Sequence, residues 1–125
     1  MRYPMVLKGK VVHGKGLGRT VGMPTANLQI TEGNLPQAGV YATKVKLGER
    51  IMNSVTNIGT RPSVDNDCDI TVEINILDFN EDIYGESIAL EICKFLRPIY
   101  KFDNLQAVQR QVKKDIVAAE TFFGI

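Results

Sequence analysis

The sequence predicts an all-β core, in which six short antiparallel strands form a Greek-key-like closed barrel that is followed by one C-terminal α-helix. Three observations predict this fold class. Short segments of alternating apolar and polar residues recur at fairly regular spacing over residues 5–95. No helical pattern separates these segments, which excludes a doubly wound parallel sheet. Helical spacing of apolar residues begins only after residue 104.

The first four predicted strands follow from alternation and turn residues. Residues 5–13 are mixed apolar and basic and are predicted to form the first strand, and residues 28–30 a short second one. Residues 31–38 are rich in glycine, asparagine and proline and are predicted to be a connecting loop. Residues 39–47 and 51–58 flank a tight turn, so we expect them to form a hairpin.

The next segments predict a second pair of strands. Residues 57–62 (NIGTRP) are predicted to break the fourth strand sharply. Residues 69–77 have the cleanest alternation in the chain, which places Glu73 on the face opposite the β-branched residues Ile70, Val72, Ile74 and Ile76. The acidic residues 78–85 are predicted to be a solvated hairpin turn before a sixth strand over residues 88–95.

The C-terminal region predicts one amphipathic helix. Residues 96–102 are basic, aromatic and irregular. Asp103 or Asn104 can cap a helix, whose apolar residues then recur at helical spacing as far as Phe123, and Gly124 marks its end. The apolar stripe of this helix is most simply explained as core contact.

The length and the charge of the chain limit its class. Its 125 residues suffice for one domain with a substantial core, so we expect residues 1–125 to form a single domain and a monomer. The net charge of +1 gives no general reason to expect a nucleic acid or a membrane as partner. The N-terminus lacks the pattern of a signal peptide. Cys68 and Cys93 have no metal-binding spacing, which favours reduced thiols in a cytoplasmic protein.

The first candidate functional segment is the glycine-rich stretch over residues 14–27, GKGLGRTVGMPTAN. A loop of this composition can turn its backbone amides toward an anion, and Arg19 adds a planar guanidinium suited to phosphate oxygens. It matches neither a Walker A loop nor a dinucleotide-binding fingerprint. On the pattern alone, an ordinary turn remains an alternative. The candidate phosphate-binding glycines are Gly14, Gly16, Gly18 and Gly22.

Two further observations add a candidate metal site and a candidate catalytic group. In an extended segment, Thr25 and Asn27 present two neutral oxygens on one face, which suits Mg²⁺ that takes its other ligands from phosphates and water. Glu73 projects from the middle of a strand, away from the core. It is either an exposed strand residue or a catalytic carboxylate, and the pattern alone favours the first.

Several motifs in this order resemble riboflavin kinase, in the form that makes up the C-terminal half of bacterial bifunctional FAD synthetases. The resemblance covers nearly the whole chain. The motifs are GMPTAN after the upstream glycines, GVYA over residues 39–42, NIGTRP over 57–62, E-x-x-x-L-D-F over 73–79, IYG over 83–85 and LRP-x-x-KF over 96–102.

The resemblance implies the reaction ATP + riboflavin → FMN + ADP and the roles of several residues. Thr25 and Asn27 would bind Mg²⁺ and the nucleotide phosphates, while Gly14 and Arg19 would belong to the loop over the phosphates. Glu73 would be the catalytic carboxylate.

The resemblance also implies a flavin-binding flap that contains Arg97, Lys101 and Phe102. Asn75 stands where many members have histidine, Ile99 where glutamate is common, and Ser63 where threonine is usual. These departures leave a second interpretation open, a flavin- or nucleotide-binding regulatory module that has lost turnover. The chain is expected to be either a lone enzyme or a domain of a larger FAD synthetase.

Overall fold

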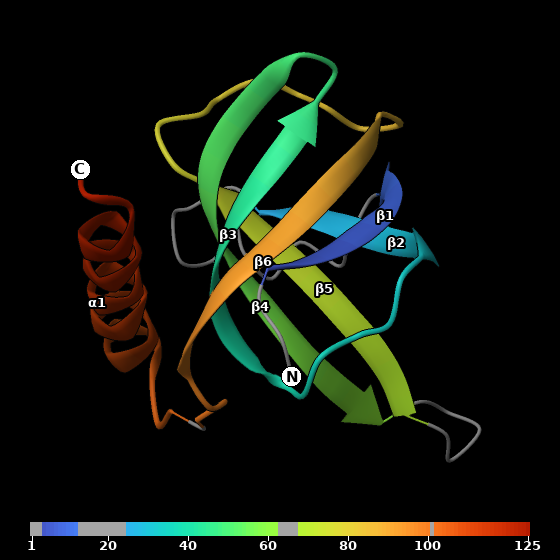
Figure 1. Ribbon diagram of the computed structural model, residues 1–125. Coiled ribbons are helices and arrows are strands. Elements are labelled where there is room, and N and C mark those ends of the chain that lie inside the picture. Colours follow the sequence, from blue (N-terminus) through green and yellow to red (C-terminus); the bar gives the residue numbers. More distant parts are fainter. Residues whose placement is uncertain (1–3, 13–24, 63–67, 101) are drawn as a thin grey trace.

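A computed structural model describes residues 4–12, 25–62, 68–100 and 102–125 and shows a closed antiparallel barrel with one helix beside it (Figure 1). The order of strands around the barrel is β1-β2-β5-β4-β3-β6, so two connections join strands that are not neighbours. This architecture confirms the predicted fold class. The elements are β1 (Met5–Val12), β2 (Ala26–Glu32), β3 (Gly39–Leu47), β4 (Arg50–Pro62), β5 (Cys68–Ile76), β6 (Ser87–Arg97) and α1 (Leu105–Phe123).

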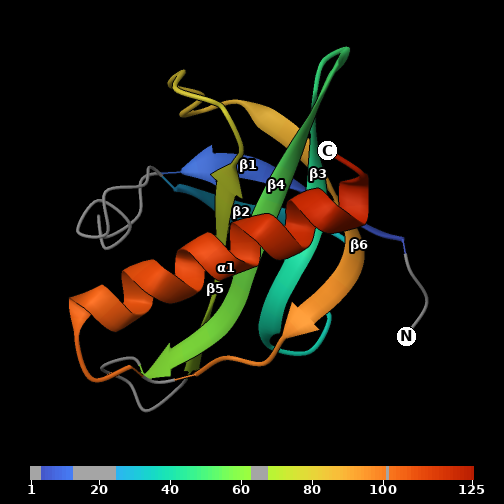
Figure 2. The same cartoon turned by 90° about the vertical axis from the view of Figure 1, so that its left-hand side faces the viewer.

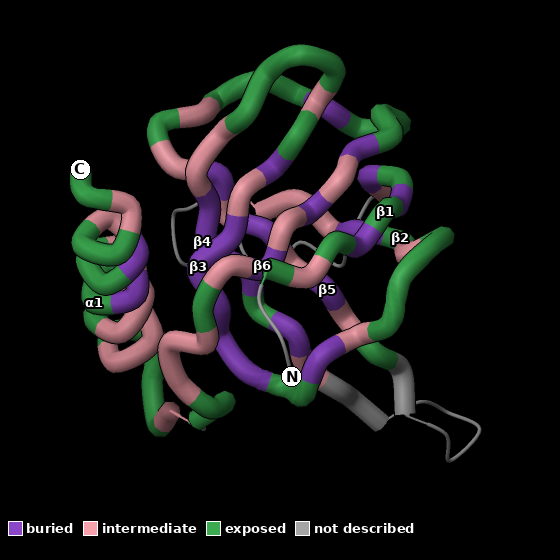
Figure 3. Tube along the Cα trace, in the orientation of Figure 1, coloured by how far each residue is buried: buried purple, intermediate pink, exposed green. Residues whose placement is uncertain are grey.

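The interior of the barrel is the main hydrophobic core (Figure 3). Leu7 of β1, Tyr41 and Val45 of β3, and Leu90 and Ile92 of β6 are each 0% exposed. Burying side chains of this size stabilises the fold by about 1.5–3 kcal/mol each. Because neighbouring residues of a strand point to opposite faces, the alternate residues of the same strands are left for the outer wall.

Helix α1 covers part of this outer wall, across β3, β4 and β6 (Figure 2). Its buried Ala119 belongs to a second apolar cluster with Val40, Ala42 and Val55, so β3 is buried on both faces. The side chain of Asn104 accepts a hydrogen bond of 2.8 Å from the backbone N–H of Ala107 and thereby caps the N-terminus. Gly124, at φ 78°, ends the helix in the left-handed conformation that glycine adopts without strain. Both ends agree with the sequence prediction.

Strand β4 corrects one prediction. Residues 57–62 do not break it, because β4 runs for 13 residues as far as Pro62 and stays paired with β5 along this segment. The proline stands at the end of the strand, where a missing backbone donor is tolerated. Strand β2 is also longer than predicted and extends over Ala26–Glu32.

The segment between β5 and β6 corrects a second prediction. Since β5 and β6 are not neighbours in the sheet, residues 78–85 form a crossover over one end of the barrel rather than a hairpin turn (Figure 1). Ile83 in this crossover is 7% exposed and joins the core. Backbone hydrogen bonds of 2.9 Å tie Gly85 and Glu86 to Val11.

Strand β6 extends through Leu96 and Arg97, which were predicted to be irregular. Pairing with β3 continues to Arg97, so this arginine is held on a strand beside α1. Within the described ranges, no helix has the length and apolar character needed to cross a lipid bilayer.

Candidate functional site

The candidate site begins with a row of residues across five strands of the barrel's outer wall. The registers pair Asn27 with Glu73, Glu73 with Asn57, Asn57 with Val40, and Val40 with Arg97. Directly paired residues share a face of the sheet. Ile74, next to Glu73 in β5, is 1% exposed in the core, which confirms the predicted outward direction of Glu73.

A cavity of about 270 Å³ lies between this wall, helix α1 and the residues Ile99, Tyr100 and Phe102. It is polar where the strands carry hydroxyl, amide and carboxylate groups, and apolar where α1 faces the barrel. Its volume is just below the range of about 300–1,000 Å³ that is common for small-molecule sites. The lining residues are Thr25, Val40, Val55, Asn57, Glu73, Asn75, Arg97, Ile99, Tyr100, Phe102, Val108, Val112, Asp115 and Ile116.

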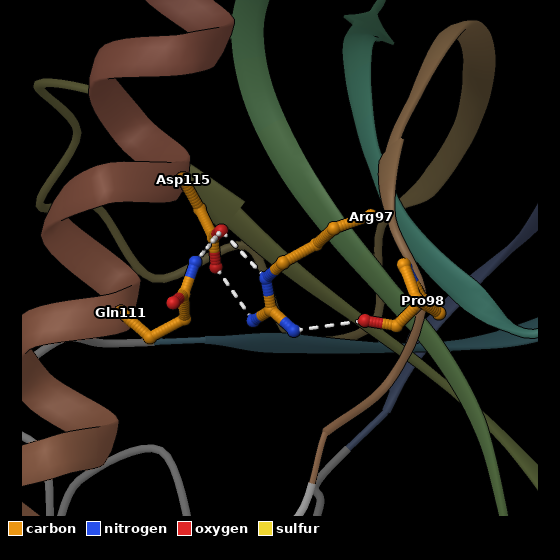
Figure 4. Close-up of polar contacts among 4 residues, drawn as sticks. All are labelled: Arg97, Pro98, Gln111 and Asp115. Atoms are coloured by element: carbon orange, nitrogen blue, oxygen red, sulfur yellow. Dashed lines mark hydrogen bonds and ion pairs between the residues drawn. The ribbon is translucent and has the colours of Figure 1, made fainter.

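Arg97 and Asp115 form a bidentate ion pair at one wall of the cavity (Figure 4). The Nε of Arg97 donates to Oδ1 of Asp115 at 2.7 Å, and one terminal nitrogen donates to Oδ2 at 2.8 Å. Gln111 donates to the same carboxylate at 3.0 Å. The side chains of Arg97 and Asp115 are only 14% and 8% exposed, so this pair fastens β6 to α1 away from most solvent.

The same arginine also holds the segment that follows it. Its second terminal nitrogen donates to the carbonyl of Pro98 at 3.0 Å. The guanidinium carbon lies 5.3 Å from the ring centre of Tyr100 and 5.9 Å from that of Phe102. These distances suit attraction between a cation and an aromatic ring. Arg97 therefore links the predicted flap both to α1 and to its own aromatic residues.

The structure brings several predicted site residues together. Thr25, Glu73, Arg97 and Phe102 line one cavity, and Asn27 lies directly beside Glu73 in the sheet. The remaining predicted residues lie outside the described residues, so their places are not assigned. These are Gly14, Gly16, Gly18, Arg19, Gly22 and Lys101.

The side-chain oxygens of the site suit a metal ion that is also bound by the phosphates of a ligand. In the described part of the chain, no group of three or more histidine, cysteine, aspartate or glutamate side chains could enclose a metal ion. Thr25 and Asn27, one on each side of Ala26, instead offer neutral oxygens at the end of the wall next to Glu73. Mg²⁺ fits such a site when phosphates supply the other ligands.

Helix α1 contributes residues that the sequence did not identify as site residues. Val108, Val112 and Ile116 were predicted to be core contacts, yet they line the cavity. Asp115 was missed altogether. The signal was present, since Asp115 follows Val112 by three residues and precedes Ala119 by four, which places a carboxylate on the buried face of the helix.

Comparison with known proteins identifies the family. The family model described as flavokinase, riboflavin kinase, matches residues 1–123. The chain belongs to the riboflavin kinase family. The bifunctional riboflavin kinase/FMN adenylyltransferase of Haemophilus influenzae is 39% identical over 123 residues, which are 97% of this chain and 39% of that protein. The chain thus spans about two fifths of the length of the curated relatives that it matches.

Two solved structures share the fold of this chain. A Streptococcus pneumoniae protein described as a macrolide-efflux protein superposes with a TM-score of 0.87 at 34% identity, over 94% of this chain and 38% of that chain. The riboflavin kinase of Trypanosoma brucei superposes with a TM-score of 0.63 at 23% identity, over 97% of this chain and 80% of that one. The second likeness shows the shared fold.

Proposed function

We propose that the chain transfers the γ-phosphoryl group of Mg²⁺-bound ATP to the 5′-hydroxyl of riboflavin and gives FMN and ADP. The observation that carries the proposal is the cavity between α1 and the barrel, which is lined by the apolar Val108, Val112 and Ile116 of the helix and by Glu73 and Thr25 of the barrel wall. A flavin has the matching polarity, with a flat ring at one end and a hydroxylated chain at the other. Membership of the riboflavin kinase family supports the same reaction.

The mechanism needs positioning and one proton acceptor. The oxygen of the 5′-hydroxyl forms a bond to the γ-phosphorus as the bond from that phosphorus to the bridging oxygen breaks, and ADP leaves with the electron pair. The Glu73 carboxylate would orient the hydroxyl and accept its proton. Thr25 and Asn27 would hold the metal and the phosphates, and the metal would neutralise charge on the transferred group.

The apolar end of the cavity would bind the flavin ring. Val108 and Val112 of α1 and Val40 and Val55 of the barrel all line the cavity and give it an apolar part. Since the cavity is small for a whole flavin, we infer that the flap residues Pro98, Ile99, Tyr100 and Phe102 move outward on binding. Arg97, at the base of this flap, would set its position.

The relatives' length supports a wider context. Because several of them are named as bifunctional riboflavin kinase/FMN adenylyltransferases and are much longer, we propose that the chain works as the kinase domain of such a protein. A lone kinase remains compatible with the same site.

Formation of FMN from riboflavin and Mg-ATP tests the proposal, with Glu73→Gln as the decisive variant. The amide keeps the size of the side chain and removes the base, so kcat should fall by about 10²–10⁴-fold while both substrates still bind. Thermal stability should change little, because Glu73 lies on the outer wall. A variant that keeps more than about a tenth of the wild-type kcat would remove Glu73 from the mechanism. Flavin binding without FMN formation by the wild type would instead favour the regulatory module.

A further inference from the structure

Asn57 stands at the centre of the row on the outer wall. It lies in β4 directly opposite Glu73 on one side and Val40 on the other. Directly opposite residues of an antiparallel pair have Cβ atoms about 4.5–5.5 Å apart, so the Asn57 carboxamide and the Glu73 carboxylate reach the same part of the cavity. Within the described part of the chain, neither side chain has a hydrogen-bonding partner.

The chemistry of Asn57 suits a hydroxylated chain. A carboxamide provides two N–H donors and one carbonyl acceptor, and a hydroxyl group both donates and accepts. It also carries no charge. An aspartate at this position would repel Glu73, and a lysine would pair with it and compete for the proton acceptor. Asn57 therefore offers polar contacts beside the carboxylate and leaves the carboxylate available.

The order of residues along the row matches the order of groups in a flavin substrate. Val40 belongs to the apolar end under α1, Asn57 follows, Glu73 comes next, and Asn27 lies last, at the predicted phosphate end. Neighbouring strands are about 4.8 Å apart, so Val40 and Glu73 are separated by about 10 Å. This span is comparable with the reach of an extended five-carbon chain and its terminal oxygen.

We propose that Asn57 is a positioning residue whose carboxamide binds the secondary hydroxyls of the substrate's side chain. These hydrogen bonds set how far the chain extends along the wall and thus bring its terminal hydroxyl to Glu73. The inference rests on the proposed function, because it takes the substrate to be a flavin with a polyhydroxylated chain. It makes Asn57 the residue that distinguishes a polyhydroxylated chain from an alkyl chain with only a terminal hydroxyl.

Two substrates and one variant test this assignment. The rate of phosphorylation is measured for riboflavin and for a flavin whose ring nitrogen carries a 5-hydroxypentyl chain, which keeps the terminal hydroxyl and lacks the secondary ones. Each neutral hydrogen bond contributes about 2- to 13-fold, so Asn57→Ala should lower kcat/KM for riboflavin by about 5- to 100-fold. The value for the hydroxypentyl flavin should change by less than about twofold, since it makes no such bonds. The KM for ATP should stay the same.

Asn53→Ala is the matched control. Asn53 lies in the same strand on the same face, opposite Lys44, and does not line the cavity. This variant should leave both flavins unaffected. An equal fall for both flavins in Asn57→Ala, or no fall for either, would overturn the proposal.

The readouts separate this inference from the proposed function. If the wild type forms no FMN, the proposed function fails, and titration of flavin fluorescence still tests Asn57 through the affinities of the two flavins. If Asn57→Ala unfolds, Asn57→Val replaces it, because valine suits a strand and has no side-chain hydrogen-bonding group. Asn57→Val should again reduce the preference for riboflavin over the hydroxypentyl flavin. An unchanged preference in the folded variant would contradict the proposal.

Discussion

Asp115→Asn should strongly destabilise the fold, because it removes the negative partner of a buried guanidinium. The pair is bidentate at 2.7 and 2.8 Å, and Asp115 and Arg97 are only 8% and 14% exposed. Removing one member of a buried ion pair costs about 3–5 kcal/mol, since the other charge is left without compensation. The entropy of unfolding is about 0.26 kcal/mol per kelvin for a chain of this length, so Tm should fall by about 11–19 °C.

Thermal and urea unfolding measure this effect, and three further variants interpret it. Arg97→Met alone and Asp115→Leu alone should each destabilise as well, because each leaves the other charged group buried and unpaired. The double variant Arg97→Met/Asp115→Leu should recover most of the lost stability, since two apolar side chains replace the pair and need no partner. If the double variant loses less stability than the sum of the two single variants, the loss of stability in each single variant arises from the unpaired charge.

The exposed pair of Arg50 and Glu81 provides a matched control. It is also bidentate, with its shorter contact at 2.6 Å, but its side chains are 50% and 53% exposed. Water and salt screen such a pair, so Glu81→Gln should change Tm far less than Asp115→Asn. Equal effects of the two substitutions, or a cost below about 1 kcal/mol for Asp115→Asn, would refute the argument from burial.

Three other predictions follow from the site and the surface. Thr25→Ala and Asn27→Ala should each weaken binding of Mg-ATP and leave riboflavin affinity without nucleotide nearly unchanged, which titrations of each ligand would show. The Arg50 guanidinium lowers the pKa of Glu81, so the stability difference between the wild type and Glu81→Gln should be present at neutral pH. That difference should disappear in unfolding curves measured as the pH falls below the ordinary glutamate value of 4.5. Burial raises the pKa of the Cys93 thiol, and the negative charge of the neighbouring Glu91 raises it further. At about pH 8.5, iodoacetamide should therefore label Cys93 more slowly in the folded chain than in urea, and peptide mapping would measure the two rates.

Local patterns predicted the strands and the direction of Glu73 well. Strict alternation in β5 placed Val72 and Ile74 in the core and Glu73 outside, because this face of the strand is buried from Val72 to Ile76, whereas Ile70 near its start is 55% exposed. The end of β4 was predicted wrongly from its glycine and proline content. Pairing of residues 57–62 with β5 maintains the strand there, and such pairing depends on a distant segment that a local pattern does not show.

The cavity is a property of long-range packing and was not predictable from local sequence. Glu73 and Val108 line the same space although 35 positions separate them. The apolar stripe of α1 that includes Val108 was predicted to be core. Periodicity shows that one face of a helix packs against the protein, but it does not show whether that face meets packed side chains or a cavity. The motifs contain the polar residues Thr25 and Glu73 that line the cavity, and the packing of α1 on the barrel supplies its apolar lining.

The alternation in β5 has an evolutionary consequence. Val72, Ile74 and Ile76 face the core, whereas Glu73 and Asn75 face the cavity. Under the proposed function, selection for abundance and selection for activity would therefore act on different, interleaved residues of one strand. In a library that contains every substitution in β5, substitutions of Glu73 and Asn75 should be tolerated when growth depends on the amount of folded protein. The same substitutions should reduce growth when it depends on activity. Deletion of one residue within β5 would exchange the two sets and remove both properties at once.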